Sequence, residues 1–162
     1  MANTPLPMRI LILCTGNSAR SQIAEALFAT RGRGRIEAAS AGSRPAERVH
    51  PFAVAVLAEA GIDWQGRSPR GMDGLEREHW DVVITVCDRA RESCPYFPGQ
   101  PVLAHWGMPD PAEVEGSDDV KRAAFRDTFV TLSRRIDRFL ALPVGKLERL
   151  ALERRMREIG TA

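Results

Sequence analysis

The sequence predicts an α/β domain in which helices cover both faces of a parallel sheet. Two observations lead to this prediction: short apolar runs alternate with amphipathic segments, and the alternation repeats within only 162 residues. Strand–helix–strand repetition builds parallel sheets. A chain of this length can bury one core, so we expect residues 1–162 to form a single domain. Its core is expected at about 8–140, with a helical extension at about 145–159.

The first three elements follow from hydrophobic pattern and stop signals. Residues 8–14, which contain the apolar run Ile-Leu-Ile-Leu at 10–13, are predicted to form a buried strand. Residues 18–30 place Ile23, Ala24 and Leu27 on one helical face, and the glycine-containing run 31–34 ends that helix. Residues 35–40 are expected to form the second strand.

The central part of the chain repeats the pattern. Residues 49–60 are predicted to be a helix that Gly61 ends, and the polar segment 63–74 is predicted to be a loop. The sequence Asp-Val-Val-Ile-Thr-Val-Cys at 81–87 is the clearest strand signal in the chain, and 101–104 is a short fourth strand.

Two helices are expected at the C-terminal end. Over residues 118–140, apolar side chains recur every three or four positions, as in an amphipathic helix. Pro143 interrupts the chain, and residues 146–159, rich in arginine and glutamate, are predicted to form a further helix that packs on the body or is solvated.

Composition excludes several classes of protein. A net charge of +2 is too small to indicate a nucleic-acid partner. No apolar run approaches the roughly 20 residues that span a bilayer, and the N-terminus lacks the pattern of a signal peptide. We therefore expect a cytoplasmic protein, with no membrane partner and a monomeric state. In a reducing compartment, the three cysteines are expected to be reactive, metal-binding or inert rather than structurally paired.

The most informative motif begins at the end of the first strand. Cys14 is followed by a short polar loop, by Arg20, and by the start of a helix. Gly16 and Asn17 tolerate unusual backbone angles, so the loop can turn its N–H groups inward as an anion-binding nest, next to the positive end of the helix. The expected oxyanion-binding residues are Thr15, Gly16, Asn17, Ser18, Ala19, Arg20 and Ser21.

The same loop is expected to activate the thiol. Arg20 supplies a fork of donors that matches a tetrahedral oxyanion, and Ser21 can donate to the thiolate of Cys14. These contacts are predicted to lower the pKa of Cys14 below that of an ordinary cysteine. The motif therefore predicts a nucleophile beneath a bound oxyanion.

This motif resembles the phosphate loop of the low-molecular-weight protein tyrosine phosphatase fold, which phosphatases share with one class of arsenate reductases. The version Cys-Thr-Gly-Asn-Ser-Ala-Arg-Ser-Gln-Ile-Ala-Glu at 14–25 is more similar to the arsenate reductases. So are Ser-Ala-Gly at 40–42, Pro-Ala-Glu-Arg-Val-His-Pro at 45–51 and His-Trp-Gly-Met-Pro-Asp-Pro at 105–111. The resemblance extends over about residues 8–140.

The resemblance implies a fold and a set of roles. It implies a four-stranded parallel sheet of order 2-1-3-4 and a general acid at Asp110, before Pro111. Strands 1 and 3 are then neighbours about 4.8 Å apart, which is compatible with the roughly 4.4–6.8 Å Cα separation of a disulfide. A thiol at Cys87, at the end of the third strand, can therefore reach Cys14.

The third thiol completes a relay under the same resemblance. Cys14 attacks arsenate with the help of Asp110, Cys87 displaces arsenite, and Cys94 moves the disulfide to Cys87–Cys94, which thioredoxin reduces. If residues 88–93 are helical, Cys87 and Cys94 lie about 10 Å apart along the axis, too far for a disulfide. We therefore expect the segment 87–97 to rearrange. No cofactor is expected.

Three other interpretations remain. A protein tyrosine phosphatase would use Cys14, Arg20 and Asp110, but it needs aromatic walls, for which Trp64 is a possible source. A non-enzymatic oxyanion sensor and a zinc site at Cys87, Cys94 and His105 are weaker alternatives, and His50, His79 and His105 are otherwise interpreted as packing or surface residues. We expect no bound metal.

The resemblance also implies how the loop is supported. Some family members bind a monovalent cation with groups that match Asn17, Glu25 and Ser40, together with a carboxylate at a position occupied here by about Arg70. An arginine there could take the place of the cation with its own charge, so no potassium site is predicted, and Asp73 nearby is the alternative carboxylate. Asn17, Glu25 and Ser40 are expected to brace the loop.

Overall fold

Four parallel strands form the centre of the molecule. The computed structural model describes residues 7–92, 94, 97–143 and 147–161. The strands are β1 (Met8–Cys14), β2 (Ile36–Gly42), β3 (Val82–Thr85) and β4 (Val102–His105). Their order is β2-β1-β3-β4, as predicted, and every pairing is parallel.

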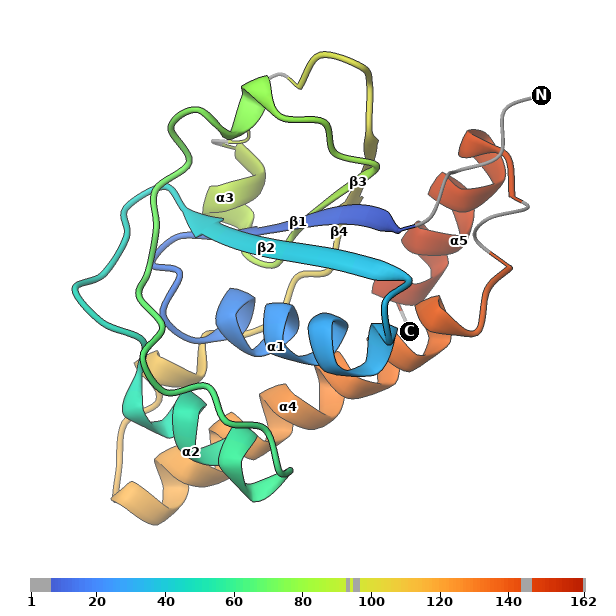
Figure 1. Ribbon diagram of the computed structural model, residues 1–162. Coiled ribbons are helices and arrows are strands. Elements are labelled where there is room, and N and C mark those ends of the chain that lie inside the picture. The colour runs from blue at the N-terminus through green and yellow to red at the C-terminus, as the bar shows by residue number, and fades with distance from the viewer. Residues whose placement is uncertain (1–6, 93, 95–96, 144–146, 162) are drawn as a thin grey trace.

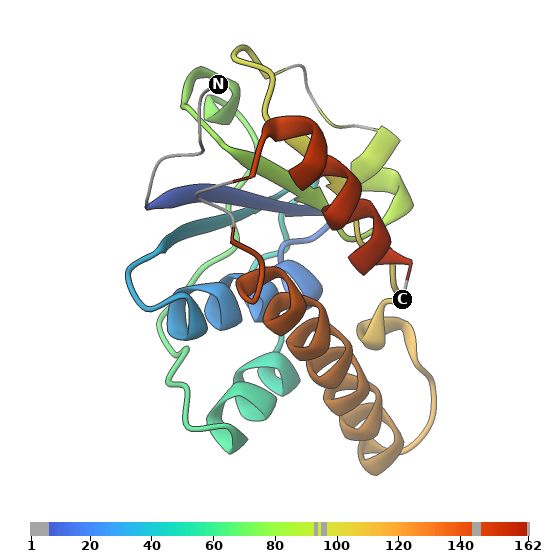
Figure 2. The same cartoon turned by 90° about the vertical axis from the view of Figure 1, so that its right-hand side faces the viewer.

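Helices flank this sheet. They are α1 (Arg20–Gly32), α2 (Pro51–Glu59), α3 (Asp88–Glu92), α4 (Asp118–Leu140) and α5 (Arg149–Gly160), with short 3₁₀ turns at Leu75–Arg77 and Pro111–Glu113. In both views α1, α2 and α4 lie on one side of the sheet (Figures 1 and 2). Among the described residues, no helix is both long and apolar enough to span a bilayer.

The buried core explains the strand pattern. All of β1 except Arg9 is buried, as the continuous apolar run predicted. Beneath it, Phe28 of α1 packs against Trp106 and Phe139, with ring centroids 6.1 and 5.7 Å apart. Apolar burial of this kind is the main driving force of folding, and it fixes the first strand and helix, between which the Cys14 loop lies.

The C-terminal helix also packs on the body. Leu152, Met156 and Ile159 of α5 are buried, and the indole N–H of Trp106 donates to the Met156 carbonyl oxygen at 3.1 Å. The helix begins three residues later than predicted, and residues 144–146 lie outside the described part of the chain.

One predicted boundary was wrong in a way that matters. The third strand was expected to run to Cys87, but β3 ends at Thr85. Val86 still donates its N–H to the Leu13 carbonyl oxygen at 3.0 Å, and then the chain turns into α3. The apolar pattern continues past the strand because Val86 and Cys87 are buried in the turn.

Candidate active site

The loop after Cys14, predicted to bind an oxyanion and called the oxyanion loop below, joins β1 to α1. Cys14 ends β1, α1 begins at Arg20, and the residues between them form the turn. Asn17 has a φ of 51°, the left-handed conformation that asparagine tolerates better than most residues. This turn aims the Asn17 N–H at the Cys14 sulfur, 3.1 Å away.

The side chain of Asn17 is the centre of a buried network. It is fully buried, and its Nδ2 donates to Ser21 Oγ and to Ser40 Oγ, both at 2.8 Å. Its Oδ1 accepts from the Arg70 N–H at 2.9 Å and from Gln22 Nε2 at 3.1 Å. Both donors and the acceptor oxygen are used, which is the full capacity of a primary amide.

The hydrogen bonds of Asn17 indicate which atom is the donor in the contact between Ser21 and Cys14. Ser21 Oγ accepts a hydrogen from Asn17, so its own proton is available for the Cys14 sulfur, 2.7 Å away. Ser40 Oγ likewise accepts from Asn17 and donates to Glu25 Oε1 at 2.9 Å. Hydrogen bonds therefore connect the half-buried carboxylate of Glu25 to the thiol of Cys14.

Burial reverses the expected shift at the nucleophile. Desolvation raises the pKa of the Cys14 thiol, and it outweighs the lowering contributions of the Ser21 and Asn17 hydrogen bonds and of the Arg20 charge. The prediction of a lowered pKa was therefore wrong. Only 2% of the Cys14 surface is exposed, and withdrawing a thiolate from water is costly.

We predict that Ser21→Ala raises the pKa of Cys14 further, because it removes the donor that stabilises the thiolate. Alkylation of Cys14 by iodoacetamide, followed by mass spectrometry from neutral to alkaline pH, should show a midpoint at higher pH and a several-fold lower rate at neutral pH. Ser18→Ala is the matched control, since Ser18 Oγ bonds the Arg48 carbonyl oxygen instead. Equal midpoints for Ser21→Ala and the wild type would contradict this assignment.

Arg20 connects the loop to the predicted general acid. Its NH1 donates to the Met108 carbonyl oxygen at 3.0 Å, and its NH2 lies 3.5 Å from Asp110 Oδ2. The Asp110 carboxylate also accepts from the Ala112 N–H at 2.9 Å, which orients it at the start of the Pro111 turn. The structure thus brings Asp110 to the guanidinium of the oxyanion loop.

The positive charge beside Glu25 comes from a different arginine than expected. Arg67 NH1 lies 3.7 Å from Glu25 Oε2, whereas Arg70 contacts the network through its backbone N–H. Burial raises the pKa of Glu25, and Ser40, Arg67 and Arg70 lower it. Among the described residues, no group of three or more His, Cys, Asp or Glu side chains is arranged to hold a metal ion.

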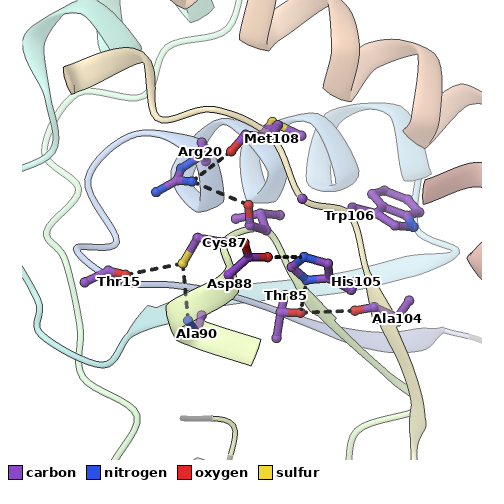
Figure 3. Close-up of polar contacts among 12 residues, drawn as sticks. Thr15, Arg20, Thr85, Cys87, Asp88, Ala90, Ala104, His105, Trp106 and Met108 are labelled. Atoms are coloured by element: carbon purple, nitrogen blue, oxygen red, sulfur yellow. Dashed lines mark hydrogen bonds and ion pairs between the residues drawn. The ribbon is translucent and has the colours of Figure 1, made fainter. Parts of the chain in front are cut away.

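Cys87 lies against the oxyanion loop. Thr15 Oγ1 is 3.3 Å from Cys87 Sγ, and the Ala90 N–H donates to the same sulfur at 3.3 Å (Figure 3). Cys94 is half-buried, and burial raises the pKa of its thiol. All three cysteines are present as thiols. The segment 87–97, predicted to rearrange, includes residues 93 and 95–96, which lie outside the described part of the chain.

The arrangement of strand, loop, arginine and helix is matched by a known family model. The model described as low molecular weight phosphotyrosine protein phosphatase matches residues 9–154. The chain belongs to this family. The match includes the oxyanion loop, all three cysteines and Asp110.

Within the low molecular weight phosphotyrosine protein phosphatase family, relatives that carry the name arsenate reductase are similar over most of the chain. The arsenate reductase of Halalkalibacterium halodurans is 38% identical over 130 residues, covering 80% of this chain and 93% of that protein. The glutaredoxin arsenate reductase of Synechocystis sp. is 30% identical, covering 82% and 96%. A solved arsenate reductase in the oxidized state has a TM-score of 0.69 and 28% identity, covering 82% and 96%.

Several contacts of this family member were not predicted from its sequence. The Thr15–Cys87 contact and the Arg67–Glu25 pair each join segments that are far apart along the chain. Trp64, considered above as a substrate wall, is only 4% exposed, and its indole N–H donates to Gln22 Oε1 at 2.8 Å. It therefore supports the network around Asn17.

Proposed function

We propose that this chain is an arsenate reductase that uses Cys14 as nucleophile and Cys87 and Cys94 as a disulfide relay. The observation that carries the proposal is the place of Cys87, whose sulfur lies 3.3 Å from the hydroxyl of Thr15, the residue after the nucleophile. Phosphate-ester hydrolysis needs no second thiol. The curated relatives named arsenate reductase support the same activity.

The first step forms a bond between sulfur and arsenic. The loop N–H groups and Arg20 hold the oxyanion, and the Cys14 sulfur attacks arsenic. An arsenate hydroxyl leaves as water, with the thiol proton supplying the balance and Asp110 passing it to the departing oxygen. Burial raises the pKa of the Cys14 thiol, which disfavours its ionised form before the attack. The product is a Cys14 thiol–arsenate adduct.

The second step transfers two electrons. The Cys87 sulfur attacks the Cys14 sulfur, the sulfur–arsenic bond breaks, and its electron pair leaves with arsenic, which changes from arsenic(V) to arsenic(III). Arsenite is released and a Cys14–Cys87 disulfide remains. The hydroxyl of Thr15 and the Ala90 N–H lie where they can stabilise the Cys87 thiolate needed for this attack.

The third step moves the disulfide outward. Cys94 attacks Cys87, which restores the Cys14 thiol and leaves Cys87–Cys94. The helix α3 separates the two thiols, and burial raises the pKa of Cys94, so its thiolate is disfavoured in the present conformation. Both facts support a rearrangement before this exchange. A dithiol reductant of the thioredoxin class, in the cytoplasm, then regenerates the enzyme.

We predict that the three cysteine variants fail at three different steps when reduced protein is mixed with arsenate, thioredoxin, thioredoxin reductase and NADPH. Cys14→Ser should make no arsenite. Cys87→Ser should stop at the adduct, and Cys94→Ser should release a single equivalent of arsenite and accumulate the Cys14–Cys87 disulfide. Arsenite is measured by chromatography and disulfides by mass spectrometry. Normal turnover of Cys94→Ser with thioredoxin would refute the relay.

Parallel assays test the reductant and the second candidate function. Replacing thioredoxin with glutathione and glutaredoxin tests the reductant named for the Synechocystis relative. Phosphatase activity is favoured by a cavity of about 250 Å³ beside Pro111, which His50, Phe52 and Phe125 line. Rapid hydrolysis of an aryl phosphate by Cys87→Ser, without arsenite production by the wild type, would make the protein a phosphatase.

A further inference from the structure

His105 links the ends of two neighbouring strands to the helix that follows Cys87. It is the last residue of β4, and its register partner is Thr85, the last residue of β3. Its Nδ1 lies 2.7 Å from Thr85 Oγ1, and its Nε2 lies 3.0 Å from Asp88 Oδ1 at the start of α3. Figure 3 shows the ring between these two side chains.

The chemistry of the partners fixes the direction of the Asp88 bond, and the protonation of the ring then sets that of the Thr85 bond. An ionised carboxylate only accepts, so Nε2 carries the hydrogen that bonds Asp88. In the neutral ring Nδ1 then accepts from the Thr85 hydroxyl at 2.7 Å, in preference to the longer contact of 3.5 Å between that hydroxyl and the Ala104 carbonyl oxygen. His105 is therefore a directed link between the end of β3 and the first residue of α3.

Cys87 lies inside the turn that this link closes. Only Val86 and Cys87 separate Thr85 from Asp88. The Cys87 sulfur also depends on α3, because it accepts from the Ala90 N–H at 3.3 Å while it contacts Thr15 Oγ1. A shift of α3 away from His105 would move the sulfur relative to the loop of Cys14.

The His105 ring packs closely against Gly107, whereas its partner Asp88 is exposed to solvent. A Cβ atom added to Gly107 would come 2.7 Å from His105 Nε2, so a larger residue there would displace the ring from its present position. The Asp88 side chain, in contrast, is 88% exposed, and hydrogen bonds at such sites are readily replaced by water. The link can hold α3 and still release it.

We propose that His105 is a positioning residue of the thiol relay: its bond to Asp88 holds Cys87 against Thr15 for attack on Cys14. Releasing that bond frees Cys87 to turn toward Cys94. This inference rests on the proposed relay. Thr85, His105 and Cys94 also line one cavity of about 460 Å³, together with Arg91 and residues of α5. The released segment therefore has space beside the same ring.

Two variants whose side chains differ by one methylene group test the two hydrogen bonds of His105 separately. His105→Gln places an amide near the position of Nε2 and can still donate to Asp88, whereas His105→Asn places it near Nδ1 and cannot reach Asp88. In a Cys94→Ser background, single-turnover arsenite release should fall about threefold to tenfold for His105→Asn. His105→Gln should stay close to wild type, and the KM for arsenate should not change in either.

Asp88→Ala and Gly107→Ala test the same link without removing the ring. Asp88→Ala alters an exposed side chain, so folding should be intact, and it should reproduce the slow first transfer of His105→Asn. Gly107→Ala should do the same by displacing the ring. In proteins that retain Cys94, rapid-quench mass spectrometry should show that the later Cys87–Cys94 exchange is not slowed.

The outcomes distinguish this proposal from the relay on which it rests. Absence of arsenite from the wild-type protein would refute the proposed function itself. Normal wild-type turnover, with first-transfer rates of Asp88→Ala and His105→Asn within twofold of the wild type, would refute the role of His105. Equal slowing of both transfers, with a lower melting temperature and a higher KM, would show a merely structural role and refute it as well.

Discussion

Asn17→Ala is expected to destabilise the protein by about 3 kcal/mol and to abolish oxyanion turnover. The substitution deletes three buried hydrogen bonds and a part-buried one, which leaves the Arg70 N–H without its acceptor. Each unsatisfied buried group costs about 1–3 kcal/mol. The substitution also forces alanine into a φ of 51°, which alanine adopts poorly. Urea unfolding and the arsenate assay measure the two effects.

Asn17→Gly is the matched control for the backbone contribution. Glycine adopts a positive φ at little cost but lacks the amide, so its stability should lie between that of Asn17→Ala and that of the wild type. The difference between the two variants then measures strain, and the remainder measures the network. An Asn17→Ala protein within about 0.5 kcal/mol of the wild type, the range of an ordinary surface substitution, would show that the network does not support the loop.

Gly42→Ala is expected to reduce the single-turnover rate about 100-fold, because a misplacement of about 1 Å in a reactive site has effects of that size. A Cβ atom at this position would overlap the Thr15 carbonyl oxygen and would lie 2.9 Å from the Asn17 backbone nitrogen. These are backbone atoms of the oxyanion loop, so the loop itself must move. Rapid-quench measurement of arsenite release checks the rate.

Gly71→Ala provides the control for this effect. Gly71 is the bridge partner of Gly42, but the nearest atom to its added Cβ is a side-chain carbon of Pro45, at 3.9 Å. This is an ordinary van der Waals contact, so activity should be retained. If Gly71→Ala lost as much activity as Gly42→Ala, the loss would result from disturbing the Gly42–Gly71 bridge and not from displacing the oxyanion loop.

The sequence predicted best where a property depends on neighbours along the chain. Helix α4 was predicted at residues 118–140 and is observed at Asp118–Leu140, because its apolar side chains keep one helical period throughout. The order of the nucleophile, the left-handed Asn17 and Arg20 could likewise be read from one short segment. Local spacing suffices for both.

The sequence did not predict side-chain partners that come from distant segments of the chain. Two arginines three residues apart were available near Glu25, and only the folded loop determines that Arg67 pairs with its carboxylate. His105 was interpreted as a packing or surface residue, because nothing near it in the sequence indicates Asp88 or Thr85 as partners. Both are hydrogen-bonded to it only because β4 lies beside β3.

By itself, the sequence determined the α/β fold and singled out Cys14 and the loop after it, the proposed nucleophile and the proposed oxyanion site, because each depends on residues contiguous in the chain. The tertiary structure decided how that nucleophile is tuned. The contacts expected to lower the pKa of Cys14 are present, but burial by the surrounding elements outweighs them. Desolvation depends on everything packed around an atom, and local spacing does not contain that information.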